Sequence, residues 1–180
     1  MKTIETNRLI LRSWTIKDVH DLYEYASLPT VGPNAGWSPH QSLDESLSIV
    51  HKFIKEDDVW AIVEKQSLKV IGSVGLHNRS DSQEKLSREI GYVLSTFYEG
   101  QGLMTEAVIG VINFAFDELG LDIIFVKHYI DNDKSRRVIE KCGFKYYETI
   151  ISKLFNGIEK ESKVYWITKT DYKKNKEEQQ

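Results

Sequence analysis

Residues 87–108 read SREIGYVLSTFYEGQGLMTEAV, and this stretch decides the fold. Its first part alternates as a β-strand, with one face formed by Ile90, Tyr92 and Leu94. A turn containing Gly100 and Gly102 follows, and a helical pattern begins near Met104. The first N–H groups of a helix have no intrahelical partner and attract anions, while glycine lets a ligand come close to the backbone. The stretch therefore predicts a strand, a turn and a helix that bind phosphate, most simply a pyrophosphate.

Two common phosphate motifs do not fit the glycine turn. A P-loop ends in Gly-Lys-Ser/Thr, whereas Gly102 is followed by Leu103 and Met104. A dinucleotide fingerprint needs a third glycine where this chain has Thr105, and it usually follows the first strand of a domain. The glycine pair alone therefore leaves the class of phosphate ligand open.

The same segment resembles a known family motif. Residues 98–107, YEGQGLMTEA, are similar to the acetyl-CoA-binding motif of the GNAT acetyltransferases, in the form used by the RimJ/RimL-like branch. The positions that match are Gly102, Thr105, Glu106 and Ala107. Glu99 stands where Arg or Gln is usual and Met104 where a small residue is usual. Backbone amides rather than these side chains would bind the phosphates, so the resemblance survives both departures.

Two further segments extend the resemblance over nearly the whole chain in the right order. Residues 132–144, NDKSRRVIEKCGF, are similar to the family segment N-x-x-S-x-x-V-x-E-K-x-G-F. Residues 5–14, ETNRLILRSW, resemble the first strand of the RimJ/RimL-like branch. The resemblance implies the GNAT fold, whose sheet splays apart between its fourth and fifth strands to admit the cofactor.

Hydrophobic periodicity predicts an α/β fold with a mixed sheet and the order β-α-α-β-β-β-α-β-α-β-β, which is also the order of the GNAT fold. Outside residues 87–108 and the helix they begin, we expect strands at residues 4–12, 59–64, 68–76, 123–126, 146–155 and 158–168, and helices after Thr15, after Ser42 and at residues 133–141. Residues 28–40 and 77–85 are predicted to be loops, and Asn156 with Gly157 to form a hairpin turn.

Composition is that of an ordinary globular domain. The 180 residues are most simply one domain, residues 1–168, followed by a polar and solvated tail at residues 169–180. A formal charge of −3 and a pI near 6.0 argue against a nucleic-acid partner. The single cysteine, Cys142, cannot form an intrachain disulfide, and no apolar run approaches the roughly 20 residues of a membrane span. We therefore expect a cytoplasmic protein without a membrane partner.

The resemblance implies that acetyl-CoA lies along the end of the central strand and the start of the next helix. Backbone N–H groups of residues 101–105 would hold the pyrophosphate, residues 92–94 would pair with the pantetheine amides, and the Leu94 N–H would stabilise the oxyanion. Each cofactor role has an alternative, in which the glycines only make a tight turn, Asn132 only caps a helix, and Arg137 only belongs to a solvated helix face. The predicted cofactor residues are Tyr92, Val93, Leu94, Gly100, Gln101, Gly102, Leu103, Met104, Thr105, Asn132, Ser135 and Arg137.

The residues for proton transfer depart from the commonest family pattern. Many GNAT enzymes have a Tyr just before the Glu of the fourth helix, but this chain has Ile139 there. Ser135 matches the RimJ/RimL-like serine and would donate a hydrogen bond to the leaving sulfur, unless it only bonds its own helix backbone. Glu89, at the start of the central strand, is the predicted base, unless it is simply surface charge. His77 and His128 are weaker candidates for the base.

The acceptor side is predicted from the irregular segment at residues 28–40. Trp37 and His40 lie in it and, together with His77, would line the cleft for the acceptor, although a loop anchor is the commoner role for a tryptophan. The first hypothesis is an enzyme that moves the acetyl group of acetyl-CoA to a primary amine, on a protein N-terminus or a small molecule, by direct attack. The second is a non-catalytic acyl-CoA-binding module. We expect no metal, and a homodimer is a further expectation for this branch.

Overall fold

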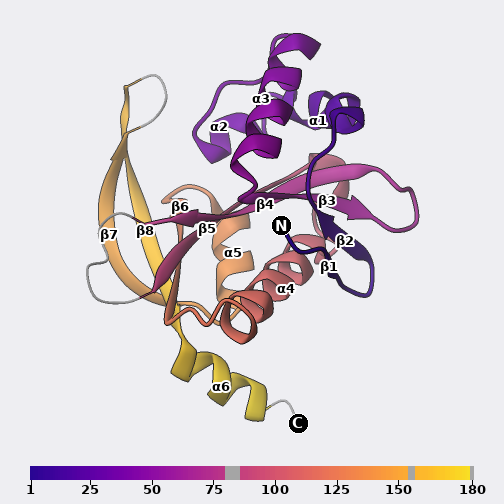
Figure 1. The fold of residues 1–180 in the computed structure, drawn as a ribbon. Helices are drawn as coiled ribbons and strands as arrows, with labels where there is room; N and C mark the ends of the chain where they lie inside the picture. Colours follow the sequence, from indigo (N-terminus) through magenta and orange to yellow (C-terminus); the bar gives the residue numbers. More distant parts are fainter. Residues whose placement is uncertain (80–85, 154–156, 179–180) are drawn as a thin grey trace.

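A mixed β-sheet forms the centre of the protein in the computed structural model, which describes residues 1–79, 86–153 and 157–178 (Figure 1). Within those residues the strand order is β1-β2-β3-β4-β5-β6-β8-β7, and every neighbouring pair is antiparallel except β5 with β6. The strands are β1 (Ile4–Glu5), β2 (Leu9–Arg12), β3 (Val59–Glu64), β4 (Val70–Asn78), β5 (Ser87–Leu94), β6 (Ile123–Tyr129), β7 (Lys145–Lys153) and β8 (Glu159–Thr168). The predicted α/β class with a mixed sheet is confirmed.

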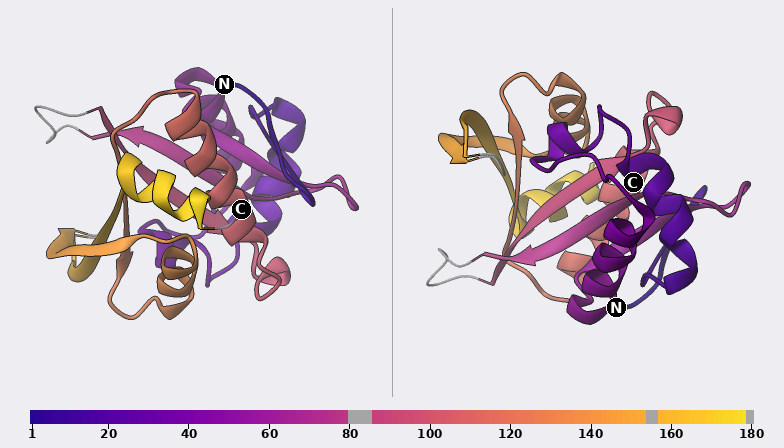
Figure 2. Two further views of the ribbon diagram at one scale, coloured as in Figure 1. Left: turned by 90° about the horizontal axis from the view of Figure 1, so that it is seen from below. Right: turned by 90° about the horizontal axis from the view of Figure 1, so that it is seen from above.

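Helices cover both faces of the sheet (Figure 1 and Figure 2). One face carries α1 (Val19–Ala26), α2 (Gly32–Ala35) and α3 (Leu43–Glu56), and the other carries α4 (Leu103–Asp117), α5 (Asp133–Lys141) and α6 (Lys169–Glu177). Short 3₁₀ turns lie at Ile16–Asp18 and Thr96–Tyr98. Within the described residues, none of the helices combines the length and the apolar character needed to cross a membrane.

The core consists of two apolar layers, one on each face of the sheet. Between the sheet and α4 the predicted helix stripe is buried throughout, namely Ala107, Val108, Val111, Ile112 and Ala115. On the other face Val50 of α3 and Tyr25 of α1 pack against β3 and β4. Full burial of one aliphatic side chain is worth about 1.5–3 kcal/mol, so these layers hold the strands in place.

The central strands β5 and β6 are paired over only half of their length. Parallel pairing joins Ser87–Ile90 to Ile123–Val126 and ends there. β5 continues to Leu94 and stays paired with β4, while β6 continues to Tyr129 and stays paired with β8. The sheet therefore opens between β5 and β6, at the position where the family resemblance implies a splay.

Two segments near the N-terminus differ from their predictions. The single strand predicted at residues 4–12 is two short strands, because the Thr6 N–H bonds the Leu9 carbonyl at 3.0 Å and closes a turn. The loop predicted at residues 28–40 contains α2, which has Pro33 in its first turn and Gly36 at φ +89° after its end. Proline at the start and glycine after the end are normal helix boundaries, so the sequence did carry this signal.

His77 and Asn78 are the last residues of β4, so the prediction that they begin a polar loop is wrong. They pair with Glu89 and Arg88 of β5. The pairing of β4 with β5 therefore continues two residues past Leu76, where the apolar pattern ends. Residues 80–85 of that predicted loop lie outside the described residues, as does Asn156 of the predicted hairpin turn. His77 is consequently held on a paired strand.

The predicted polar tail forms a helix at Lys169–Glu177, most of whose side chains are exposed or half-buried, as expected of a solvated segment. A capping box starts α6, because Thr168 Oγ1 accepts from the Asp171 N–H at 3.1 Å and the Asp171 carboxylate accepts from Thr168. Tyr172 is buried, stacks on Phe116 of α4 with 4.9 Å between ring centroids, and donates to Asp117 at 2.8 Å. One tyrosine therefore docks an otherwise polar helix.

Replacing Tyr172 by Ala should lower the free energy of unfolding by about 3 kcal/mol, because it removes a buried ring that anchors α6. Lys173→Ala on the exposed side of the same helix is the control and should change it by less than about 0.5 kcal/mol. Denaturant unfolding followed by circular dichroism measures both. Equal, small effects would mean that α6 is not docked in solution.

Candidate active site

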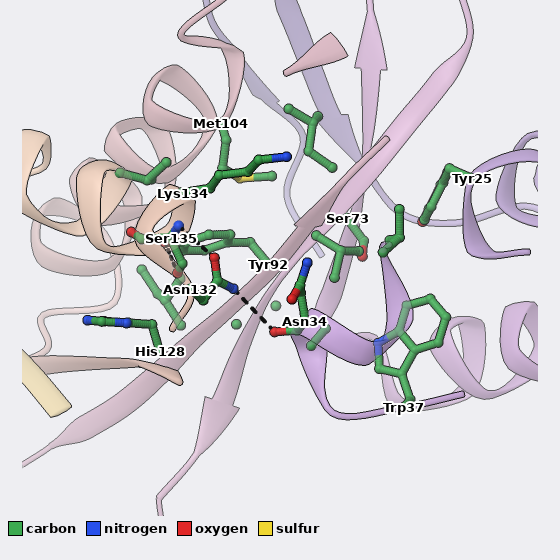
Figure 3. A pocket seen from close by; sticks show the side chains of 18 of the residues that line it. Tyr25, Asn34, Trp37, Ser73, Tyr92, Met104, His128, Asn132, Lys134 and Ser135 are labelled. Carbon is green, nitrogen blue, oxygen red and sulfur yellow. Dashed lines mark hydrogen bonds between the residues drawn. The ribbon is translucent and has the colours of Figure 1, made fainter. Parts of the chain in front are cut away.

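A cavity of about 1070 Å³ opens where β5 and β6 part (Figure 3). This volume is at the upper end for ligand pockets, which span roughly 300–1,000 Å³. The predicted site residues that line it are Trp37, His40, His77, Glu89, Tyr92, Val93, Leu94, Gly100, Gly102, Leu103, Met104, Thr105, Asn132, Ser135 and Arg137. Gln101 does not line it, and its carbonyl instead accepts a hydrogen bond from Arg8 Nη1 at 2.9 Å. Residues far apart in the sequence thus meet at one cavity.

The first functional feature is the open backbone edge of β5 at residues 91–94. The Ser95 N–H donates to Ile71 O at 2.8 Å, on the side of β4. Because successive N–H groups of a strand point to opposite edges, the Leu94 N–H points towards the opening. An extended ligand with amide groups can bind such an edge as an additional strand.

The second feature is the start of α4, which follows that edge. Gly102 is the N-cap, with φ +76°, and α4 has no side-chain cap, whereas Ser42, Asn132 and Thr168 cap α3, α5 and α6. The first intrahelical bond is Glu106 N–H to Gly102 O at 3.0 Å, which leaves the N–H groups of Leu103, Met104 and Thr105 for a ligand. A helix start without its own cap fits a phosphate group.

Glu106, a position of the family motif, fixes the glycine turn to the N-terminal strands. Its carboxylate accepts from the Arg8 backbone N–H at 2.8 Å, from Arg8 Nε at 2.7 Å and from Thr6 Oγ1 at 2.6 Å. Burial raises the pKa of Glu106, but these hydrogen bonds and the Arg8 charge outweigh it and hold the pKa below its ordinary value. Arg8 was not predicted as part of the site, because no local pattern links it to a turn more than ninety residues away.

The basic side chains of α5 differ in their availability to a phosphate. Arg136 is ion-paired with Asp133 at 3.0 Å and with Glu140 at 2.9 Å. Arg137 and Lys141 line the cavity, and within the described part of the chain neither forms an ion pair. Arg137 therefore lies in the cavity without a carboxylate partner among the described residues, whereas Arg136 is neutralised, and the contact of Arg137 with a CoA phosphate stays a prediction.

Ser135 lies against a tyrosine of the neighbouring strand. Ser135 Oγ and Tyr92 Oη are 2.8 Å apart (Figure 3). Tyr92 Oη also lies 3.2 Å from the Ser135 carbonyl, to which it can donate. Burial raises the pKa of Tyr92 more than hydrogen bonding with Ser135 lowers it, so the phenol stays protonated. The sequence predicted only a backbone role for Tyr92, since no sequence pattern places β5 beside α5.

Asn132 caps α5 and also bridges the opening. Its Oδ1 accepts from the Ser135 N–H at 3.0 Å, and its Nδ2 donates to Asn34 O at 3.3 Å (Figure 3). The second bond joins α5 to α2, which lie on opposite faces of the sheet. The helix-cap interpretation of Asn132 is shown by this geometry, and its contact with pantetheine stays a prediction.

Trp37 and His40 lie in the cavity wall on the side of α1 and α3. Their ring centroids are 5.2 Å apart, and a Cβ on Gly32 would lie 2.5 Å from the Trp37 ring. His40 Nδ1 lies 2.7 Å from Ser46 Oγ, and burial lowers the pKa of His40 against the opposing charge of Glu45. Both residues thus anchor their loop, and a contact with substrate stays a prediction.

Glu89, the predicted base, is ion-paired across the opening. Its Oε1 lies 2.9 Å from Lys127 Nζ on β6, and its Oε2 lies 4.0 Å from Arg79 Nη1. Its side chain is 26% exposed and lines the cavity. The carboxylate is therefore partly occupied by a cation of the same protein, and its role as base stays a prediction.

Cys142 is unsuited to act as a nucleophile. Its side chain is buried, its Sγ faces Thr105 O at 3.8 Å, and burial raises the pKa of the thiol to about 12. Thiolate is the nucleophilic form of cysteine, so this residue stays unreactive near neutral pH.

Comparisons with known proteins agree with this geometry. Residues 8–145 match the family model described as Acetyltransferase (GNAT) domain. The chain is 28% identical over 172 residues to the "Uncharacterized N-acetyltransferase YoaA" of Bacillus subtilis (strain 168), a match that covers 92% of this chain and 96% of that protein. The chain belongs to the GNAT acetyltransferases, since the family model matches more than half of it.

Solved structures share the fold at low identity. Ribosomal-protein-S5-alanine acetyltransferase from Vibrio fischeri is 21% identical with a TM-score of 0.75, covering 96% of this chain and 99% of that chain. Spermidine N-acetyltransferase from Vibrio cholerae, solved with CoA and spermine, is 20% identical with a TM-score of 0.76, covering 93% and 99%. Family and relatives together identify an N-acetyltransferase that uses acetyl-CoA, which favours the enzyme over the non-catalytic module.

Gly102→Ala should weaken CoA binding, because a Cβ strains the left-handed backbone that aims the first amides of α4. Gly120→Ala is a matched control, since Gly120 has φ +68° and does not line the cavity. Both variants should lose about 1–2 kcal/mol of stability. Calorimetry with CoA should show weaker binding for Gly102→Ala alone, and unchanged binding would remove the α4 amides from the site.

Arg137→Gln should reduce CoA affinity about tenfold, or ~1.4 kcal/mol, because it removes a cation available to a phosphate. Arg136→Gln is the control from the same helix and should leave affinity unchanged, since Arg136 already has two carboxylate partners. Calorimetry with CoA and with dephospho-CoA locates the contact. A loss confined to CoA assigns Arg137 to the 3′-phosphate, and equal affinities of both variants would exclude it from binding.

Proposed function

We propose that this enzyme acetylates a primary amine, on a protein N-terminus or a small molecule, by direct attack on the thioester of acetyl-CoA. Bound acetyl-CoA supplies an activated acetyl group, and the protein supplies positioning, hydrogen-bond donors and a proton acceptor. One observation carries the proposal. The open edge of β5 and the uncapped start of α4 follow each other along the chain and line the same cavity.

The cofactor side of this proposal rests on backbone groups. The amides of Leu103, Met104 and Thr105 hold the pyrophosphate, and residues 91–94 pair with the pantetheine arm. The Leu94 N–H serves as the oxyanion donor, because it points into the opening from a rigid strand. Backbone donors need no particular side chain, so Glu99 and Met104 in the motif do not weaken the site.

The hydroxyl pair of Ser135 and Tyr92 donates to the leaving sulfur. Ser135 keeps its own O–H for the sulfur when Tyr92 Oη donates to Ser135 Oγ at 2.8 Å and not to the Ser135 carbonyl at 3.2 Å. The pair does the work of the tyrosine that many family members carry where this chain has Ile139. Direct attack without an acyl-enzyme is supported by the burial of Cys142.

The acceptor enters from the face of α1 and α3. Tyr25, Trp37 and Phe53 line this side of the cavity, and aromatic faces attract ammonium groups. The same cavity wall carries Glu89, whose carboxylate is ion-paired with Lys127. A cytoplasmic location is also part of the proposal, supported by the free thiol of Cys142. A homodimer stays a prediction.

The test is amine-dependent thiol release from acetyl-CoA. The panel is spermidine and short peptides beginning with alanine or serine, and the control is each peptide with its N-terminus already acetylated. We expect thiol release with at least one free amine, none with the blocked peptides, and a product heavier by one acetyl group in mass spectrometry.

Two results would contradict the proposal in different ways. Absence of heat with CoA and acetyl-CoA in calorimetry would remove the cofactor site. Binding of acetyl-CoA without thiol release for any free amine, on this panel and on a wider set of amines, would leave a binding module instead of an enzyme.

A further inference from the structure

His77 and Asp58 form a hydrogen-bonded pair at the edge of the cavity. His77 Nδ1 lies 2.8 Å from Asp58 Oδ2. Asp58 is held in place because its carbonyl accepts the Leu76 N–H of β4 at 2.9 Å. A carboxylate can only accept, so Nδ1 carries the proton and the neutral ring keeps its lone pair on Nε2. The pair thus fixes both the orientation and the tautomer of the imidazole.

Two glycines make room for the free nitrogen of this ring. Gly75 of β4 and Gly91 of β5 are direct partners in the sheet. A Cβ on Gly75 would lie 2.4 Å from His77 Nε2, and one on Gly91 would lie 3.7 Å from it. The ring therefore rests over bare backbone, and Gly91 is the first residue of the open edge of β5.

The other two candidates for a proton acceptor are less available. Glu89, directly across the ladder from His77, has Lys127 Nζ at 2.9 Å. His128 also lines the cavity, but its Nε2 is buried from solvent, and its ring packs on Tyr165 with 5.5 Å between centroids. The His77 side chain is 45% exposed and lines the cavity.

We infer that His77, oriented by Asp58, is the general base that deprotonates the acceptor amine. Nε2 takes one proton from the acceptor ammonium, so an N–H bond forms on the ring while one breaks on the amine, which keeps the electron pair for attack. The ring returns the proton to water through the cavity. This inference rests on the proposed acetyl transfer, and it moves the base from Glu89 to its cross-strand neighbour.

Substitution at His77 should lower turnover without touching the cofactor. His77→Gln should reduce kcat about 100-fold or more with the best amine of the spermidine and peptide panel, while CoA affinity by calorimetry stays unchanged. Glu89→Gln in the same assay should reduce kcat far less. Asp58→Asn should reduce kcat by an intermediate factor, because the imidazole remains but its tautomer is no longer fixed by a carboxylate.

Chemical rescue separates a base from a structural residue. Added imidazole should restore part of the turnover of His77→Ala but none of Glu89→Gln, because only the first leaves a gap for the ring. Gly75→Ala should lower kcat strongly in the native protein, because the added Cβ displaces the His77 ring. The same change should lower kcat little in His77→Gln, where that ring is already absent.

A readout independent of turnover is the tautomer of His77. Long-range ¹H–¹⁵N NMR of the ligand-free protein should show a protonated Nδ1 and a bare Nε2 in the neutral ring, and a proton on Nε2 instead would overturn the inference. Full turnover in His77→Gln, or no rescue of a folded His77→Ala, would overturn it while acetyl transfer stands. Failure of every amine with the native protein would remove both.

Discussion

The structure depends on one constraint, which is that β5 and β6 stop pairing after Ile90 and Val126. Backbone N–H and C=O groups inside a protein need partners, and the free edge of β5 at residues 91–94 finds none in the described part of the sheet. The edge faces a cavity rather than bulk surface, which leaves room for the proposed pantetheine arm to pair with it. The same strand leads into the start of α4, which has no side-chain cap. The free N–H groups of that helix start favour an anion.

Contacts across the opening keep the two halves of the sheet at a fixed separation. On one face, Tyr92 of β5 bonds Ser135 of α5. On the other face, the Asn132 side chain donates to the carbonyl of Asn34 in α2. The Tyr129 hydroxyl also approaches Gly36 closely, because a Cβ on Gly36 would lie only 2.5 Å from it. Beneath them, one apolar layer joins Ile90 of β5 to Ile124 and Val126 of β6, so the two halves of the sheet share a core. The opening is thus a built feature and not a defect of packing.

Alternation along β5 places the proposed proton donor and the proposed proton acceptor on opposite faces of the sheet. Tyr92 packs with the layer under α4 and α5, where it meets Ser135. Glu89 and Gly91 face the layer under α1 and α3, where His77 and the aromatic wall lie. Successive side chains of a strand point to opposite faces, so one strand can present groups to the thiol and to the amine without bringing them together.

Local pattern determined much of this protein. The glycine turn and the apolar stripe of α4 were predictable because each depends on residues within a few positions of one another. Tyr172 shows where local pattern is insufficient. The sequence of α6 is that of a polar tail, and only the packing of the Tyr172 ring on Phe116 explains why the helix docks. The chemistry shows it more sharply. Tyr92 meets Ser135 across 43 residues and His77 meets Asp58 across 19, and both pairs depend on strand register and helix placement. The sequence by itself determined which helix start lacks a side-chain cap, whereas only the tertiary structure decided that Tyr92 meets Ser135 and that His77 meets Asp58, because register and packing alone bring those partners together.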